Sequence, residues 1–150
     1  MLSLRRAAKE DSMLLFEWID DSDVRKNSFN PNYISIEEHL KWFESKLHDV
    51  NCEIYIILYN YKNIGMLRLE KEGSYYKISY LIDKKYRGKG IGTKLLSYIK
   101  KIFFNRILVG YVKYDNIASI KAFEKSRYIK INKENYIKFI SKYESNIKYE

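Results

Sequence analysis

Three closely spaced glycines give the clearest chemical signal in this sequence. Gly88, Gly90 and Gly92 stand at alternate positions, Lys89 lies between the first two, and the chain has only six glycines in all. A turn that lacks Cβ atoms can aim successive backbone N–H groups at one point. The stretch 91–104 has the apolar spacing of an amphipathic helix, whose free N-terminal amides and positive dipole end adjoin the turn. We therefore expect an anion site suited to a phosphate or a pyrophosphate.

The glycine spacing excludes two common nucleotide-binding loops. The phosphate loop of nucleotide hydrolases needs G-x-x-x-x-G-K-[ST], and the dinucleotide fingerprint G-x-G-x-x-G fails because Thr93 and Leu95 occupy its last position. What remains is Arg87-x-x-Gly90-x-Gly92 between an apolar strand and a helix. This segment resembles the acetyl-CoA signature R/Q-x-x-G-x-G/A of the GNAT superfamily of N-acetyltransferases. The simpler alternative is a turn that only joins a strand to a helix.

The resemblance implies which residues hold acetyl-CoA, the co-substrate. In the superfamily the glycine turn grips the diphosphate, and the strand before it lies beside the pantetheine arm and splays away from the next strand. A backbone N–H near Tyr80, Leu81 or Ile82 then stabilises the oxyanion. The cofactor-binding residues implied in this way are Leu81, Ile82, Arg87, Gly88, Lys89, Gly90, Ile91, Gly92 and Thr93. The resemblance implies no metal.

A second part of the same superfamily pattern follows the next predicted strand. Residues 116–128 read Asn-Ile-Ala-Ser-Ile-Lys-Ala-Phe-Glu-Lys-Ser-Arg-Tyr and resemble N-x-x-A/S-x-x-x-Y-E-K-x-G-F. The match implies that Asn116 and Ser119 contact the cofactor, although Asn116 could equally be a helix N-cap. The chain departs from the pattern at Phe123, where many members have a tyrosine that protonates the leaving thiolate, and at Arg127, where they have glycine. We expect the turn at Arg127 to differ accordingly.

The reaction implied by this resemblance needs proton transfer. A neutral amine that attacks a thioester must lose a proton to a base, and the oxyanion must be stabilised. The candidates for the base are His39, Glu38, Glu70 and Tyr80. His39 titrates near neutral pH when unperturbed, but it could also be an exposed helix residue, and Glu70 could be a surface charge. We expect the catalytic residues to be among His39, Glu70 and Tyr80.

Two N-terminal segments narrow the resemblance to one branch of the superfamily. Residues 24–29 and 34–43 resemble acetyltransferases that act on UDP-linked 4-amino sugars in pseudaminic acid and spore-coat polysaccharide pathways. This branch implies that Arg25, Ser28 and His39 face the acceptor, and an anionic UDP-sugar gives Arg25 a physical reason to be there. We therefore expect direct attack of the 4-amino group of a nucleotide-linked sugar on acetyl-CoA.

Other functions stay open at the level of sequence. The acceptor could be a protein N-terminus, as in the ribosomal-protein branch, or a small amine. The protein could instead be a degenerate acetyltransferase that only binds CoA, an alternative suggested by Phe123. The formal net charge of +9 would also suit a nucleic-acid-binding domain, but the lysines are scattered rather than grouped in one block. We expect no nucleic-acid partner, and a homodimer is left open.

The expected elements follow the order β-α-α-β-β-β-α-β-α-β-β, which matches the superfamily fold. Ser35 and Glu38 form a capping box, so a helix begins there with Leu40, Phe43 and Leu47 as its apolar stripe. The remaining elements are strands at 3–7, 53–59, 64–70, 75–82, 106–112, 128–131 and 136–140, helices that begin near 12, 91 and 116, and a short helical turn near 24–25. We expect an α/β (α+β) fold in which helices flank a mixed, mostly antiparallel, twisted sheet.

Length and composition fit one cytoplasmic domain. The 150 residues, of which 46% are hydrophobic and 31% charged, suffice for one core. We expect an N-acetyltransferase domain at 1–144 and a polar tail at 145–150. The sequence has no apolar run of about 18 residues and none of signal-peptide length near its start, so we expect no membrane span and a cytoplasmic location. The single cysteine, Cys52, cannot form an internal disulfide or a metal site, and we expect it to be a packing residue.

Overall fold

A seven-stranded sheet is the centre of the fold. The computed structural model describes residues 1–143, so residue 144 and the predicted tail at 145–150 lie outside the described residues. The strands are β1 Leu2–Arg6, β2 Cys52–Tyr59, β3 Lys62–Glu72, β4 Tyr75–Ile82, β5 Ile107–Val112, β6 Ile129–Asn132 and β7 Ile137–Ile140. They lie in the order β1-β2-β3-β4-β5-β7-β6, and β4 and β5 are parallel whereas the other neighbouring pairs are antiparallel. This mixed, mostly antiparallel sheet confirms the predicted fold class.

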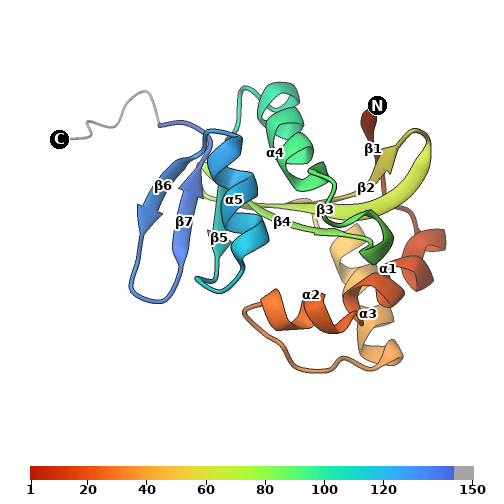
Figure 1. Ribbon diagram of the computed structural model, residues 1–150. Helices are drawn as coiled ribbons and strands as arrows, with labels where there is room; N and C mark the ends of the chain where they lie inside the picture. Colours follow the sequence, from red (N-terminus) through yellow and green to blue (C-terminus); the bar gives the residue numbers. More distant parts are fainter. Residues whose placement is uncertain (144–150) are drawn as a thin grey trace.

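Helices cover both faces of the sheet. They are α1 Ser12–Ile19, α2 Ser22–Asn27, α3 Ile36–Leu47, α4 Ile91–Ile102 and α5 Ile117–Lys125, with short 3-10 helices η1 Lys9–Asp11 and η2 Lys84–Tyr86. Figure 1 shows α4 and α5 on one face and α1, α2 and α3 on the other. The helical turn predicted near 24–25 is a complete short helix, α2, because the Asp21 carboxylate accepts the N–H groups of Asp23 and Val24 at 2.8 and 3.2 Å.

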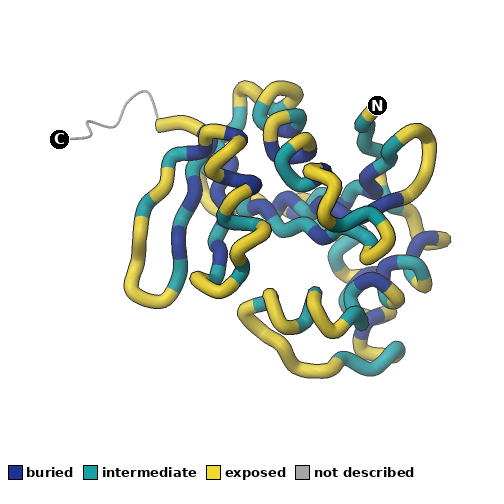
Figure 2. Tube along the Cα trace, viewed as in Figure 1, coloured by how far each residue is buried: buried dark blue, intermediate teal, exposed yellow. Residues whose placement is uncertain are grey.

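Two hydrophobic cores lie on opposite faces of the sheet. The larger core lies between the sheet and the pair α4 and α5, and its buried helical members are Ile91, Leu95, Leu96, Ile99, Ala122 and Phe123. The smaller core lies between the sheet and the pair α1 and α3, and its buried helical members are Leu15, Trp18 and Phe43. In β4, Ile78 belongs to the larger core and Leu81 to the smaller, because successive strand residues alternate between faces. The buried stretches in Figure 2 follow the strands and the helix surfaces that face them.

Helix α3 begins where the sequence predicted, but its buried stripe contains His39 in place of Leu40. The Ser35 hydroxyl accepts the Glu38 N–H at 3.2 Å, which confirms the predicted cap. The predicted apolar stripe is wrong at Leu40, which is 41% exposed, whereas His39 is 1% exposed. The buried face is set by the pair His39 and Phe43, four residues apart, whose rings stack with 6.0 Å between centroids. The helix therefore places an imidazole where the apolar pattern predicted a leucine.

Helix α5 ends in the turn that the sequence predicted would change. The Tyr128 N–H donates to the Phe123 carbonyl at 3.2 Å and the Arg127 N–H donates to the Glu124 carbonyl at 3.0 Å, which is a Schellman motif. Arg127 has φ +61°, the left-handed conformation that glycine favours. The prediction that this turn differs is therefore wrong. The chain keeps the turn and places a non-glycine residue in it, which costs about 1–2 kcal/mol.

Cys52 is buried at the start of β2. Its side chain is 3% exposed, and the thiol pKa is raised, chiefly by burial. This position supports the predicted packing role. Among residues 1–143, no helix has both the length and the apolar character needed to cross a membrane, and no three His, Cys, Asp or Glu side chains gather as a metal site would require.

Candidate active site

The parallel strands β4 and β5 separate halfway along β4. They pair only as far as Ile78 and Gly110. Beyond these residues β4 continues to Ile82 along β3, while β5 continues along β7. Within the described part of the chain, one edge of the segment 79–82 therefore has no strand partner. Backbone groups on such an edge can pair with an extended ligand, and the separation lies where the resemblance implied it.

The glycine turn lies just beyond the end of β4 and leads into α4. Gly88 and Gly90 have φ +75° and +74°, and apart from their chain neighbours no atom lies within 4 Å of the place that a Cβ would take. Gly90 is the N-cap of α4, and its carbonyl accepts the Lys94 N–H at 3.1 Å. The amides of residues 91–93 precede this first helical hydrogen bond and are free for another acceptor. Open space and converging amides give the turn the geometry of an anion site.

Tyr80 connects the separated strands with the glycine turn and α5. Its hydroxyl lies 3.0 Å from the Ser119 hydroxyl oxygen and 3.5 Å from the place that a Cβ on Gly92 would take. Burial raises the pKa of Tyr80, and the hydrogen bond to Ser119 opposes this effect only in part. The phenol is therefore neutral at physiological pH and is better suited to donating a proton than to accepting one. The Asn116 side chain accepts the Ser119 N–H at 3.3 Å, so the N-cap alternative for Asn116 holds.

Arg87 ties the glycine turn to the helices on the other face of the sheet. Its Nε–H donates to the Ile82 carbonyl at 2.9 Å, and its guanidinium pairs with Asp21 at 3.3 Å and Asp23 at 3.4 Å. The side chain thus holds the end of β4 against the N-terminus of α2. The structure gives Arg87 a positioning role for the turn, beside the cofactor contact implied by the resemblance.

Phe123 lies against the last paired residue of β5. The ring is 2% exposed and stacks on Phe139 with 4.7 Å between centroids. A Cβ on Gly110 would lie only 2.4 Å from the Phe123 Cζ, so the ring fits here because residue 110 is glycine. The para carbon, where a tyrosine would carry its hydroxyl, therefore faces the point where β4 and β5 separate. Phe123 has no hydroxyl that could donate a proton there. The neighbouring ring of Tyr80 has a hydroxyl, and its centroid lies 6.3 Å from that of Phe123.

His39 lies between α1 and α3 rather than at an open surface. Its Nε2 makes a hydrogen bond with the Ser12 carbonyl at 2.8 Å, and the rings of Phe16 and Trp42 lie 5.4 and 6.1 Å away between centroids. Burial lowers the pKa of the imidazole, and the hydrogen bond to Ser12 opposes this effect in part. The alternative that His39 is an exposed helix residue is wrong. The carboxylate of Glu38 is exposed and accepts the Ser35 hydroxyl at 3.1 Å.

Glu70 sits in a cluster of cationic side chains on the same face of the sheet as α3. It pairs with Lys46 and Arg68, each at 2.9 Å, and with Lys77 at 3.9 Å. Burial alone would raise the pKa of Glu70, but the Lys46 hydrogen bond and the three positive charges lower it. A carboxylate with a lowered pKa is a weaker base. Lys77 also pairs with Glu72 at 3.5 Å. We call Lys46, Arg68, Glu70, Glu72 and Lys77 the Glu70 cluster; it combines three cations with two carboxylates.

The residues predicted to face the acceptor hold the segment between α2 and α3. Arg25 pairs with Asp20 at 2.9 Å and lies over the ring of Tyr33 at 5.2 Å, and the Ser28 hydroxyl accepts the Asn30 N–H at 3.2 Å. The structure thus places Arg25 and Ser28 in one segment and His39 in the smaller core, and it does not bring the three together.

The same segment reaches across to the C-terminal strands, which the sequence did not indicate. Phe29 lies edge-on to Tyr136 with 6.2 Å between centroids, and the Lys113 ammonium donates to the Lys26 carbonyl at 3.0 Å. These contacts join α2 and the residues that follow it to the residue after β5 and the residue before β7. No local pattern marks such long-range contacts of loop residues. By contrast, Arg68 and Glu70 are two positions apart in one predicted strand, so the sequence does indicate that their side chains lie on the same face of the sheet.

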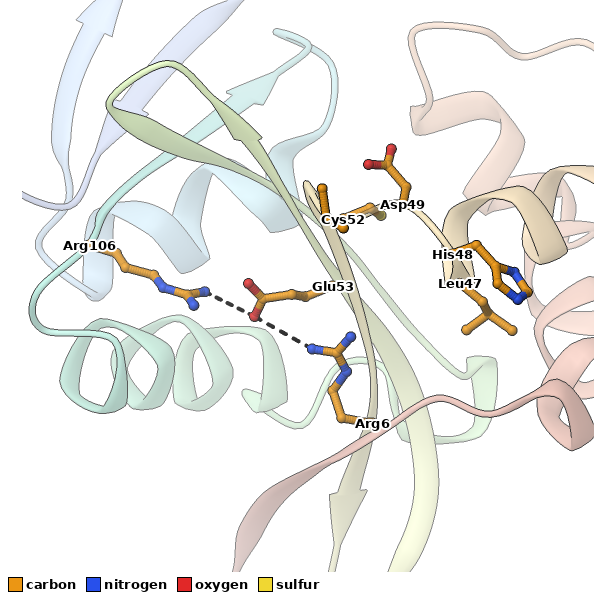
Figure 3. Close-up of a pocket in the computed structure, with 8 residues that line it drawn as sticks. Arg6, Leu47, His48, Asp49, Cys52, Glu53 and Arg106 are labelled. Carbon is orange, nitrogen blue, oxygen red and sulfur yellow. Dashed lines mark hydrogen bonds and ion pairs between the residues drawn. The ribbon is translucent and has the colours of Figure 1, made fainter.

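A cavity of about 420 Å³ lies at the other end of the sheet, where β4 and β5 are paired. Figure 3 shows Glu53 between Arg106 and Arg6, which approach its carboxylate to 3.0 and 3.9 Å. With Asp49 also in its wall, the cavity has two cations and two carboxylates, so it has no net charge to attract an ion. It is remote from the glycine turn, and we assign it no part in the candidate active site.

Comparison with known proteins identifies the family. The model of the acetyltransferase (GNAT) family matches residues 14–127. The chain belongs to the GNAT family. Its members are acetyltransferases, so this GNAT chain is an acetyl-CoA-dependent N-acetyltransferase, as the sequence predicted. No curated protein matches it in sequence.

Solved structures share the fold of this GNAT domain at low sequence identity. Aminoglycoside acetyltransferase AAC(6')-Ib with paromomycin and acetyl-CoA has a TM-score of 0.79 and 18% identity, over 91% of this chain and 92% of that one. Spermidine N-acetyltransferase from Vibrio cholerae with CoA and spermine has a TM-score of 0.79 and 16% identity, over 93% of both chains. The ribosomal L7/L12 alpha-N-protein acetyltransferase RimL with CoA has a TM-score of 0.76 and 17% identity, over 93% and 92%. The likeness shows a common fold and leaves the acceptor to be argued from the site.

Proposed function

We propose that this GNAT protein acetylates the 4-amino group of a UDP-linked amino sugar, by direct attack of the amine on acetyl-CoA. The observation that carries the cofactor part is the separation of β4 from β5 beside the glycine turn. The amides of residues 88–93 would hold the diphosphate, and the free edge of 79–82 would hold the pantetheine arm. Asn116 and Ser119 would border that arm on the side of α5.

The charge of the acceptor face supports an anionic acceptor. The Glu70 cluster carries more positive than negative charge, and Arg68 reaches to within 3.4 Å of the hydroxyl of Ser79, the first residue of the unpaired part of β4. Paromomycin and spermine, present in two similar structures, are polycations. Such acceptors would meet repulsion here, whereas a UDP-sugar would be attracted.

Proton transfer is best supported at Tyr80. Its neutral hydroxyl lies at the separation of the strands, next to Ser119. Glu70 is held by three cations, and His39 is buried with its Nε2 occupied by the Ser12 carbonyl. We therefore place Tyr80 as the residue that delivers a proton to the leaving thiolate, a role that Phe123 cannot fill. The proton that the amine loses on forming the amide then restores the Tyr80 phenol, so no net proton is released.

Release of free thiol from acetyl-CoA tests the proposal. We expect turnover with a UDP-linked 4-amino sugar and far less with spermidine, an aminoglycoside or a peptide with a free N-terminus, all at one concentration. Arg68→Gln should lower kcat/KM for the sugar nucleotide by about tenfold, because it removes the charge. Arg68→Lys keeps the charge but not the stacking on Trp42, so it should recover only part of the loss.

Two results would overturn the acceptor assignment. Faster turnover of the peptide or of spermidine would move the protein to the ribosomal-protein or small-amine type. Tight CoA binding without transfer to any amine would identify a degenerate CoA-binding module.

A further inference from the structure

Tyr80 and Ser119 face each other between the first turns of two helices. Their hydroxyl oxygens lie 3.0 Å apart, and either hydroxyl can be the donor. Gly92 is in the first turn of α4, and the place that a Cβ on it would take lies 3.5 Å from the Tyr80 hydroxyl. Ser119 is in the first turn of α5. The phenol oxygen thus lies beside the positive dipole ends of both helices, where a negative charge on it is favoured.

The start of α5 is fixed on both sides of Ser119. The side chain of Asn116, the N-cap of α5, accepts the Ser119 N–H at 3.3 Å. One turn further along the helix, Phe123 is buried and stacks on Phe139 with 4.7 Å between ring centroids. The Phe123 ring also flanks the ring of Tyr80, 6.3 Å away between centroids. Ser119 therefore presents its hydroxyl to Tyr80 from a backbone that is held in place.

The direction of this hydrogen bond decides what Tyr80 can do. Tyr80 has one hydroxyl proton, and it cannot donate that proton to Ser119 and to a thiolate at the same time. When Ser119 is the donor, the phenol proton is free to point away from α5. Burial raises the pKa of Tyr80, and the Ser119 hydrogen bond lowers it in part, because a donated hydrogen bond favours the phenolate. A serine donor at this place therefore makes the phenol a stronger acid.

We propose that Ser119 is a positioning residue for acetyl transfer, whose hydroxyl donates to Tyr80 and holds the phenol proton toward the leaving sulfur. This inference rests on the proposed role of Tyr80 as the proton donor. As the amine nitrogen bonds to the acetyl carbon, the C–S bond breaks, its electron pair goes to the sulfur, and the sulfur takes the Tyr80 proton. Ser119 donates to the resulting phenolate until the phenolate takes the proton that the amine loses. Ser119 itself is unchanged at the end of the cycle.

Single-turnover rates of thiol release test the inference, with any amine that the wild-type protein acetylates. The rate at saturating acetyl-CoA and the affinity for acetyl-CoA are measured separately for each variant. Ser119→Ala should lower the rate by about tenfold, the effect of losing a hydrogen bond to a charged group, and should change the affinity far less. Ser119→Thr keeps a hydroxyl and should recover most of the rate.

A double-mutant cycle separates positioning from packing. Tyr80→Phe should lower the rate at least about 100-fold, as expected for loss of a general acid. Adding Ser119→Ala to Tyr80→Phe should cause no further loss, because Ser119 then has no phenol to hold. Ser126→Ala is the matched control, since the Ser126 hydroxyl donates to the Thr93 carbonyl at 3.0 Å and joins the same two helices at the other end of α5. Its rate should equal that of the wild type.

Three results would overturn the inference: an unchanged rate in Ser119→Ala, a further loss when Ser119→Ala is added to Tyr80→Phe, or an equal loss in Ser126→Ala. A weaker affinity with an unchanged rate would make Ser119 a cofactor contact alone. An unchanged rate in Tyr80→Phe would refute the proposed proton donor itself, and the inference with it. A wrong acceptor in the proposed function leaves all of these comparisons intact.

Discussion

The two faces of the sheet build their parts of the site in different ways. On the α4 and α5 face, the proposed cofactor site consists of backbone amides, left-handed glycines and a gap between two strands. On the α1 to α3 face, the proposed acceptor region consists of charged and aromatic side chains, and those singled out in the sequence, Arg25, His39 and Glu70, each have a partner within the protein. The first face therefore depends on chain conformation and the second on side-chain pairing.

This difference separates the effects of mutation on the two faces. A change in the glycine turn should alter ligand binding with little change in stability, because the turn faces open space. A change in the buried pairs of the acceptor face should alter stability first, because those groups are engaged with each other. Gly90→Asp and His39→Gln test this contrast, whereas Gly110→Ala and Arg127→Gly test the packing and the backbone of the α5 side.

The largest effect is expected for Gly90→Asp. A carboxylate at the N-cap of α4 would point into the space intended for the diphosphate, and like charges in contact cost several kcal/mol, so CoA affinity should fall at least about 100-fold. Gly73→Asp is the control, because Gly73 also has a positive φ, +63°, and open space around its Cβ position but lies in the β3–β4 turn. Calorimetry measures both. Retained affinity in Gly90→Asp would contradict the placement of the diphosphate.

The next effect is expected for Gly110→Ala. The new methyl group would lie 2.4 Å from the Cζ of Phe123, and overpacking of this kind costs about 1–3 kcal/mol of the free energy of unfolding. Gly92→Ala is the matched control, since its Cβ would meet its nearest neighbours at 3.5 Å, an ordinary contact. Urea unfolding of both variants is the measurement. Equal stabilities would show that Phe123 can move away from β5.

Arg127→Gly should make the protein more stable. The left-handed backbone at residue 127 costs an L-residue about 1–2 kcal/mol that glycine does not lose, although glycine gains freedom in the unfolded chain, so a net gain of about 1 kcal/mol is expected. Arg127→Ala keeps the strain and removes the side chain, so it should not share the gain. Thermal unfolding compares the three proteins, and a stabilised Arg127→Ala would mean that the side chain rather than φ is unfavourable.

The smallest effect is a pH dependence at His39. Because burial lowers the pKa of its imidazole in the folded state, the unfolded chain takes up a proton first as the pH falls below the ordinary histidine value of about 6.5. Stability should then decrease with falling pH in the wild type and less so in His39→Gln, which can still donate to the Ser12 carbonyl. Unfolding from about pH 8 to about pH 5 measures this.

The same variant tests the catalytic alternative. At about pH 8, where the imidazole is neutral in both states, His39→Gln should retain turnover. A loss of more than about tenfold at that pH would restore His39 as the base.

The sequence predicted the local structure of the proposed cofactor side better than that of the proposed acceptor side. Gly88 and Gly90 are visible in sequence because a left-handed backbone restricts the residue type, and the strand, turn and helix around them follow from local patterns. The N-cap at Ser35 was equally readable, since its partner Glu38 is three residues away.

The acceptor side depends on choices that local patterns do not fix. Whether His39 or Leu40 faces the core is set by a small rotation of α3 against α1, and both fit a helical period. The contacts of Phe29 with Tyr136 and of Lys113 with Lys26 join segments that are far apart in sequence. The prediction for the turn at Arg127 was wrong for another reason. It assumed that only glycine can occupy this position of the family pattern, whereas the fold tolerates the moderate strain of a left-handed arginine.

The link from Arg87 to Asp21 and Asp23 has a consequence for engineered chimeras. If the N-terminal third were replaced by that of a relative in order to change acceptor selectivity, Arg87 would lose Asp21 and Asp23 as partners unless both aspartates were kept. The Trp18 indole N–H donates a hydrogen bond to the Asp83 carboxylate at 2.9 Å, which is a second link between the N-terminal third and the end of β4. Chimeras that keep the pairing of Arg87 with both aspartates and the bond between Trp18 and Asp83 should exchange acceptor preference and retain cofactor binding.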